Sequence, residues 1–382
     1  MIQKIFTDIF NADPIVVRSP LPMRLMGEYN LYNDGWLLTT TLSKFVEVAV
    51  SKREDAGIEL FSVQHLEKIA LSPSDLIHIP KASWAKALFA VIYQLHLAGH
   101  NPQGLNIMID TSQLEEGIPF DAALESALYI AINELFNLRL SSRALLAIGT
   151  DPFDPDFYSC LFGKKGYALK LDARNQSHDY IPLRMEDYSP VLCIMGNRAC
   201  IPANIYRNRY CACEDVLFQL KKVDGTIKSV RDVELPLLFS HITNTEIRRR
   251  AAFIIRENTR VIAASTNLQA GNLKAFGQKL SESDDGLMAE YEIGSTEADW
   301  LVDELGWSEQ VVGARRLTVP YRNAAIAFVR TSRLEETNFN LAKAFEKQFG
   351  KKLNMYPVLT AHGAERVQLN DRINEEYDNR LR

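Results

Sequence analysis

The chain has 382 residues, of which 47% are hydrophobic and 24% charged, and it carries a formal net charge of −5. This length allows two domains with a core each, and the composition is that of a soluble globular protein. Because a mildly acidic chain lacks the basic surface that neutralises phosphates, we expect no nucleic-acid partner.

The N-terminus and the apolar segments predict neither secretion nor a membrane span. Gln3, Lys4 and Asp8 interrupt the apolar residues at the start of the chain, which is not the pattern of a signal peptide. The apolar stretch 84–97 is also interrupted, and it is too short to cross a bilayer. Five cysteines without CxxC spacing favour a reducing compartment and no metal site. We therefore expect a cytoplasmic protein without a membrane partner.

Hydrophobic periodicity predicts both strands and helices in the first half of the chain. Residues 35–50 are rich in β-branched and aromatic types and predict a strand, as does the short run 106–110. Residues 82–98 predict a helix. Apolar residues that recur every three or four positions from Asp121 predict a second one.

A second half begins near residue 190. The apolar run 191–195 predicts a short strand, and residues 203–220 predict a helix. One long helical region is expected from Thr245 to about Leu280, with several arginines on its polar faces. Because helices and strands are mixed throughout, the class is α+β or α/β.

Five segments carry motifs in a fixed order. They are GEYNLYNDG at 27–35, LFGKKGYAL at 161–169, RRAAFIIRENTRV at 249–261, LSESDDGLMAEYEIGSTEADWLV at 280–302 and VGAR at 312–315. In sequence and spacing, these segments resemble the motifs of the galactokinase family, which belongs to the GHMP small-molecule kinases.

The resemblance implies an α+β fold, the two-lobed fold of the GHMP kinases. It places an N-terminal lobe with a mixed sheet at residues 1–190 and a C-terminal lobe of ferredoxin-like character at residues 191–382. It also implies a cleft between the lobes for ATP and a sugar. Because one fold hosts many functions, the site has to be assessed residue by residue.

The family binds phosphate with a loop of the form P-x-x-x-G-L-S-S-S-A, which aligns with residues 119–128. Its glycine is Ala123 here, one of its serines is Glu125, and Ser126 remains as the candidate phosphate ligand. Asp121 is placed to cap the following helix. A carboxylate at ~4 Å from a phosphate costs about 1–4 kcal/mol. An ordinary capped helix and a carboxylate that acts through Mg²⁺ are both compatible with this segment.

The third family motif is a run of glycines, and no glycine follows Gly313 in the aligned residues 315–324. The simplest structure for this segment is strand–turn–strand. Arg315 and Arg322 are candidates to attract an anion, although arginines on a surface usually have no such role.

The candidate catalytic residue is Asp156, which aligns with the aspartate that the family uses near the attacking hydroxyl. Asp154 is an alternative occupant, and Phe153 replaces a family glycine. The family's phosphate-stabilising arginine falls on Pro22, a loss that can cost about three orders of magnitude in rate. Arg24 lies two positions further along and is a candidate replacement for phosphate binding.

The resemblance also supplies candidate sugar-binding residues, namely Glu28, Asp34 and Tyr206. The sugar-binding histidine of the family is Tyr29 here, and its aspartate is Leu31. Each missing hydrogen-bond partner costs roughly 1–3 kcal/mol, so galactose in the usual pose is disfavoured. Structural roles remain open, with Glu28 paired between lobes and Tyr206 in the core.

These replacements lead to the hypothesis of a non-catalytic galactokinase-like pseudokinase. It would bind a sugar, a sugar-like ligand or nothing, without a cofactor, as a sensor or regulator of carbohydrate metabolism. The alternative is an active, divergent sugar kinase with Mg·ATP as cofactor and no other metal. Such an enzyme would use Asp156 as base and Arg24, Lys164 or Lys165 as cation. A third hypothesis is a structural partner in a larger assembly.

Overall fold

The computed structural model describes residues 2–71, 84–112, 114, 118–149, 151, 153–196, 203–318, 321 and 323–368. The chain divides into two compact units. Unit 1 consists of the described parts of Met1–Pro22, Thr41–Lys165 and Ala361–Arg382, and unit 2 of those of Met23–Thr40 and Gly166–Thr360. The division into residues 1–190 and 191–382 stays a prediction.

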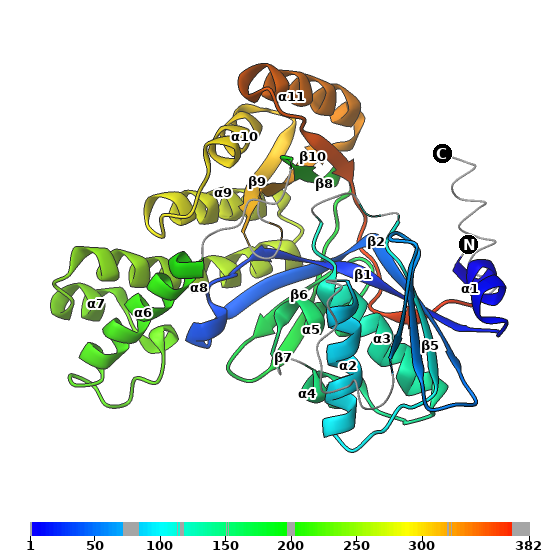
Figure 1. Ribbon diagram of the computed structural model, residues 1–382. Coiled ribbons are helices and arrows are strands. Elements are labelled where there is room, and N and C mark those ends of the chain that lie inside the picture. The colour runs from blue at the N-terminus through cyan, green and yellow to red at the C-terminus, as the bar shows by residue number, and fades with distance from the viewer. Residues whose placement is uncertain are drawn as a thin grey trace. The chain divides into compact units, whose positions relative to one another are not determined.

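Unit 1 contains a mixed sheet and several helices (Figure 1). Its elements are α1 (Ile2–Phe10), the first part of β1 (Ile15–Met26), most of β2 (Trp36–Lys52), β3 (Ile58–Ser62), β4 (Glu67–Leu71), α2 (Ala85–Leu97), β5 (Leu105–Asp110), α3 (Asp121–Leu135), α4 (Ser142–Ile148), α5 (Pro155–Phe162) and β12 (Glu365–Arg366). The strand order is β12-β1-β2-β5-β3-β4. β3 is parallel to β5, and β2 is antiparallel to it.

Alternating side chains give this sheet its core. In β2 and β5 the buried pairs include Val48 with Ile109 and Ala49 with Met108. Ala49 and Met108 pack against α1, through residues such as Phe6. The strands predicted over 35–50 and 106–110 and the helix predicted from Asp121 are therefore confirmed. The helix predicted over 82–98 is confirmed as α2, and residues 82 and 83 lie outside the described residues.

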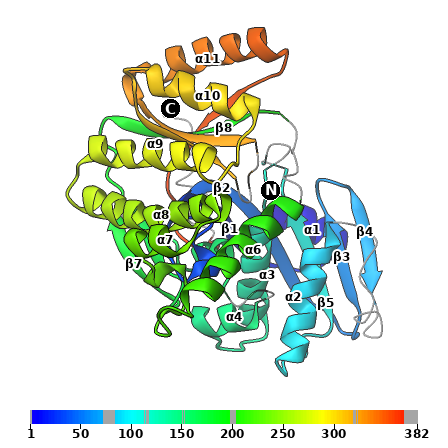
Figure 2. The same cartoon turned by 90° about the vertical axis from the view of Figure 1, so that its left-hand side faces the viewer.

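Unit 2 contains the ends of β1 and β2 and a second sheet (Figures 1 and 2). Its further elements are η1 (Leu31–Asn33), β6 (Tyr167–Asp172), β7 (Ser177–Pro182), β8 (Tyr188–Ile194), α6 (Ala203–Leu220), η3 (Val230–Asp232), α7 (Leu235–His241), α8 (Thr245–Gln269), α9 (Leu273–Ala289), α10 (Thr296–Trp307), β9 (Val311–Leu317), β10 (Ala324–Arg330), η4 (Thr331–Arg333), α11 (Leu334–Phe349) and β11 (Asn354–Pro357). The second sheet has the order β11-β8-β10-β9 and is antiparallel.

Helices cover both faces of the second sheet. Val191 and Cys193 of β8 pack against α10 and α11. On the opposite face, Phe328 of β10 meets Phe276 of α9 with ring centroids 5.4 Å apart. Figure 1 shows this layering, with α10 and α11 on one side of the sheet and α9 on the other. The two strands predicted around 315–324 are confirmed by the pairing of β9 with β10, and residues 319, 320 and 322 of the predicted turn lie outside the described residues.

The long helical region predicted from Thr245 to about Leu280 is confirmed, and it consists of two helices. α8 ends at Gln269 and α9 begins at Leu273. Gly271 adopts φ +72°, a left-handed conformation that ends a helix, and Asn272 accepts a hydrogen bond from the Ala275 amide to start the next. The predicted helix over 203–220 and the strand near 191–195 are confirmed as α6 and β8.

The helices in the described ranges lack any apolar segment of the length that a membrane span needs.

The close approach of α9 to β9 depends on glycine. A Cβ added at Gly277 would lie 1.8 Å from the carbonyl oxygen of Val312. Because a backbone atom cannot swing aside, we expect Gly277→Ala to lower the free energy of unfolding by about 1–3 kcal/mol or more. Urea denaturation followed by circular dichroism measures this change.

Gly306→Ala is the matched control. Gly306 lies in α10, and an added Cβ there meets no heavy atom within 4 Å. Alanine favours the helix, so this variant should be as stable as the wild type or more stable by about 0.5–1 kcal/mol. Equal losses in the two variants would contradict the packing argument.

Candidate functional site

The loop between β1 and β2 holds the motif at 27–35. Gly27 has φ +85°, and a Cβ there would lie 2.4 Å from the carbonyl oxygen of Trp36, so only glycine fits. The Gly27 amide donates to Oε1 of Glu257 at 3.1 Å, and the Trp36 amide donates to Oδ1 of Asn258 at 2.8 Å. Two neighbouring residues of α8 therefore hold both ends of the loop.

Glu28 lies in a fully buried ion pair. Arg315 of β9 donates from Nη1 to Oε1 of Glu28 at 2.6 Å and from Nη2 to Oε2 at 2.5 Å, and both side chains are 0% exposed. Arg315 Nε donates to Ser283, whose hydroxyl donates to Glu257 at 2.6 Å. Burial alone would lower the pKa of Arg315. The surrounding carboxylates have the larger, opposite effect, so the pKa lies above its ordinary value and the guanidinium stays charged.

Arg315, a candidate to attract an anion, is not on the surface, and its guanidinium is already paired with Glu28. Its partner Glu28 lies 287 positions away in the sequence, a pairing that no local pattern reveals. A buried guanidinium is stable only when its donors are matched, and Glu28 and Ser283 match them. Arg322 lies outside the described residues.

Tyr29 brings the candidate residues Glu28 and Tyr206 into one neighbourhood. The Tyr29 ring stacks on that of Tyr206, with centroids 6.1 Å apart, and tilts against Tyr291 at 4.7 Å. Burial raises the pKa of Tyr29 well above its ordinary value, and the nearby Tyr206 and Glu28 add to the shift. The hydroxyls of Tyr32 and Tyr291 hydrogen-bond to each other. This cluster is a set of neutral phenols in the core of unit 2.

Asp34 takes part in a different group of contacts. It has φ +57° and is the last residue of the turn. Its carbonyl oxygen accepts from Arg231 at 2.8 Å, and its carboxylate lies 3.4 Å from Arg174. Arg24 lies on β1 in the same unit and is 7% exposed. The ligand-binding roles of Asp34, Tyr206, Glu28 and Arg24 stay predictions.

Ser126 lies in unit 1, inside α3. Its side chain is buried, and its hydroxyl donates to the carbonyl oxygen of Ala122 at 2.8 Å. The prediction that Asp121 is the N-cap is wrong by one position. Phe120 is the cap residue and Asp121 is already helical, with no hydrogen bond from a side chain to the helix end. The Asp121 carboxylate instead lies in the first turn, where its negative charge interacts favourably with the positive end of the helix dipole.

Asp156 lies in the first turn of α5 and is 5% exposed. Asp154 is the N-cap of this helix and accepts from the Asp156 amide at 3.0 Å. Burial raises the pKa of the Cys160 thiol, the Asp156 charge raises it further, and the nearby hydroxyls of Ser19 and Ser126 lower it. Asp156 and Ser126 therefore lie around the same thiol, and their predicted roles are untested.

Within the ranges that the structure describes, no three His, Cys, Asp or Glu side chains gather as ligands for a metal ion.

Comparison with known proteins shows what this chain is similar to. The galactokinase galactose-binding signature matches residues 4–52. The galactokinase of Thermotoga maritima is 26% identical over 362 residues, which cover 92% of this chain and 99% of that protein. The galactokinase of Clostridium acetobutylicum is 26% identical over 383 residues, with 96% and 98% covered. The resemblance to the galactokinase family is confirmed.

Solved structures show that the galactokinase-like chain has the GHMP-kinase fold. A galactokinase of Lactococcus lactis in complex with galactose superposes with a TM-score of 0.88 at 22% identity, covering 96% of this chain and 99% of that one. The Methanococcus jannaschii mevalonate kinase superposes with a TM-score of 0.63 at 13% identity, covering 92% and 100%. The predicted α+β fold class is therefore confirmed.

We expect the buried ion pair to govern stability in this galactokinase-like chain. Arg315→Met leaves the Glu28 carboxylate buried without its partner, so the free energy of unfolding should fall by about 3–5 kcal/mol. Removing both charges in Glu28→Leu with Arg315→Met should recover most of this loss. Chemical denaturation of the single and double variants measures both changes.

Arg333→Met is the control for the loss of an arginine as such. Arg333 pairs with Glu336 at 2.9 Å, and the two side chains are 57% and 63% exposed. An exposed pair contributes about 0–1 kcal/mol, so this variant should unfold almost like the wild type. If the double variant is no more stable than Arg315→Met, the ion pair is not the cause.

Proposed function

We propose that the protein is a galactokinase-like pseudokinase, which binds a small sugar-like ligand without transferring phosphate to it. The support comes from the segment that aligns with the family's phosphate loop. Triphosphates are held by backbone amides and hydroxyls at the start of a helix. In α3, Asp121 lies in the first turn, and the Ser126 hydroxyl donates within the helix.

The residues of this segment do not fit Mg·ATP. Residues 118–128 contain two carboxylates, Asp121 and Glu125, and no Lys or Arg. A carboxylate at ~4 Å from a phosphate costs about 1–4 kcal/mol, which is a large part of an ordinary nucleotide affinity.

The loop between β1 and β2 that holds the motif at 27–35, here called the signature loop, supports a ligand other than galactose in the usual pose. Both oxygens of Glu28 accept from Arg315, and Tyr29 packs into the tyrosine cluster. Leu31 offers no polar atom in its side chain, where the family has an aspartate. With these groups unavailable, the loop can bind fewer hydroxyl groups of a ligand than the family binds on galactose. We therefore propose that the pseudokinase acts as a cytoplasmic sensor or regulator of carbohydrate metabolism.

An active, divergent ATP-dependent sugar kinase is the second candidate, and the comparisons favour it more directly. The relatives named above are galactokinases, and the similarity extends over 92% and 96% of this chain. Asp156 is retained in the first turn of α5. On this proposal Asp156 is the base, and Arg24, Lys164 or Lys165 supplies the positive charge near the phosphate.

Calorimetry with Mg·ATP and an ADP-release assay with a panel of sugars separate the two candidates. For a pseudokinase we expect no saturable heat from Mg·ATP, no ADP above the buffer rate, and a rise of the melting temperature with at least one sugar.

Two variants identify the source of any turnover. Asp156→Asn removes the candidate base, whereas Asp13→Asn removes an exposed carboxylate for which the described residues offer no ionic partner. ADP formation that is lost in Asp156→Asn and kept in Asp13→Asn would establish the kinase and overturn the pseudokinase proposal.

A further inference from the structure

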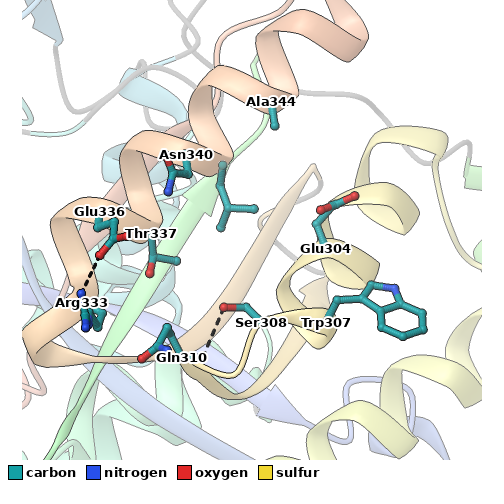
Figure 3. Close-up of a pocket in the computed structure, with 10 residues that line it drawn as sticks. Glu304, Trp307, Ser308, Gln310, Arg333, Glu336, Thr337, Asn340 and Ala344 are labelled. Carbon is teal, nitrogen blue, oxygen red and sulfur yellow. Dashed lines mark hydrogen bonds and ion pairs between the residues drawn. The ribbon is translucent and has the colours of Figure 1, made fainter.

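Unit 2 contains an open groove that belongs to neither candidate site. Its volume is about 560 Å³, within the range of small-molecule sites. It lies between the end of α10, the turn that follows, and α11 (Figure 3). The lining comes from α10 and the turn (Glu304, Trp307, Ser308, Gln310) and from η4 and α11 (Arg333, Glu336, Thr337, Asn340, Leu341, Ala344).

The groove presents polar side chains that the protein itself does not use. Among the described residues, none hydrogen-bonds to the side chains of Glu304, Gln310 or Asn340. In Figure 3, Asn340 and Glu304 stand on opposite sides of the groove. A carboxylate accepts hydrogen bonds, and each amide both donates and accepts, so together they match hydroxyl groups.

The apolar part of the groove is small and lies beside an exposed indole. Leu341 and Ala344 of α11 contribute apolar surface. Trp307, at the end of α10, is a lining residue and is 85% exposed. In Figure 3 its indole ring points away from α11, so it lies next to the groove and does not cover it.

The charge of the lining argues against an anion. Arg333, the basic residue of the lining, is paired with Glu336 at 2.9 Å. Glu304 is an additional carboxylate, and the carbonyl groups at the end of α10 add partial negative charge. A neutral ligand rich in hydroxyl groups is not repelled by this negative charge, and its hydroxyl groups can donate hydrogen bonds to the carboxylate and amide oxygens.

We propose that this groove is a binding site for a neutral carbohydrate of one or two rings, separate from the signature loop. Glu304, Gln310 and Asn340 bind its hydroxyl groups, and Leu341 and Ala344 contact its C–H face. The proposal does not depend on whether the chain is a kinase or a pseudokinase.

The test follows the indole N–H signals of the four tryptophans by NMR while galactose, glucose, lactose or maltose is added to the full chain. We expect a saturable shift of the Trp307 signal with at least one sugar. Trp36 adjoins the signature loop, so its signal reports binding there, and the two sites are distinguished in one experiment. Binding seen at Trp36 alone would overturn the groove proposal and leave the proposed function intact.

Matched variants test the assignment of residues. Asn340→Ala should weaken the Trp307 response about three- to tenfold, because one hydrogen-bonding side chain is lost. Phe339→Ala removes an aromatic side chain on the same helix that is 67% exposed and does not line the groove, and it should leave the affinity unchanged.

Three outcomes would overturn the proposal. One is the absence of a saturable Trp307 shift with any of the four sugars. Another is a shift with spermidine alone, which would assign the groove to a cation. The third is a Trp307 shift that depends on protein concentration and follows a dimer in sedimentation, which would assign the groove to a second copy of the chain.

Discussion

The buried ion pair between Glu28 and Arg315 is the interaction on which the organisation of unit 2 depends. Two charges away from water are stable only when each is fully matched, and Ser283 and Glu257 complete the match. These four residues come from the β1–β2 loop, α8, α9 and β9. Glu257 also accepts a hydrogen bond from the amide of Gly27, which lies 230 positions away in the sequence. The same network therefore holds the signature loop in position.

Several segments that resemble galactokinase motifs contain residues of this network or lie next to one. Neighbouring Arg316 donates its amide to Asp284 at 2.7 Å and pairs with the same carboxylate through its side chain. The segments 249–261, 280–302 and 312–315 thus contain the residues that hold one another and the loop in place. Their similarity to galactokinases reports on a shared scaffold, and a shared scaffold does not settle the chemistry of the site.

The candidate site residues lie in separate groups of contacts in unit 2 and in unit 1. Glu28 and Tyr206 lie around Tyr29 within the tyrosine cluster, which is a packed arrangement in the core. In unit 1, Ser126 bonds within its own helix, although Asp156 keeps its place in α5. Similarity to galactokinases over most of the chain and two carboxylates in the segment 118–128 therefore occur together.

Elements with local signals are predictable from the sequence. The strand over 35–50 and the helix over 203–220 follow from periodicity, and the resemblance to galactokinases follows from short motifs, because both depend on neighbouring residues. Only the tertiary structure decided that Arg315 is buried, since its partner lies 287 positions away. It also decided that the Ser126 hydroxyl bonds to Ala122, since a hydroxyl in a helix can turn to the backbone or away from it.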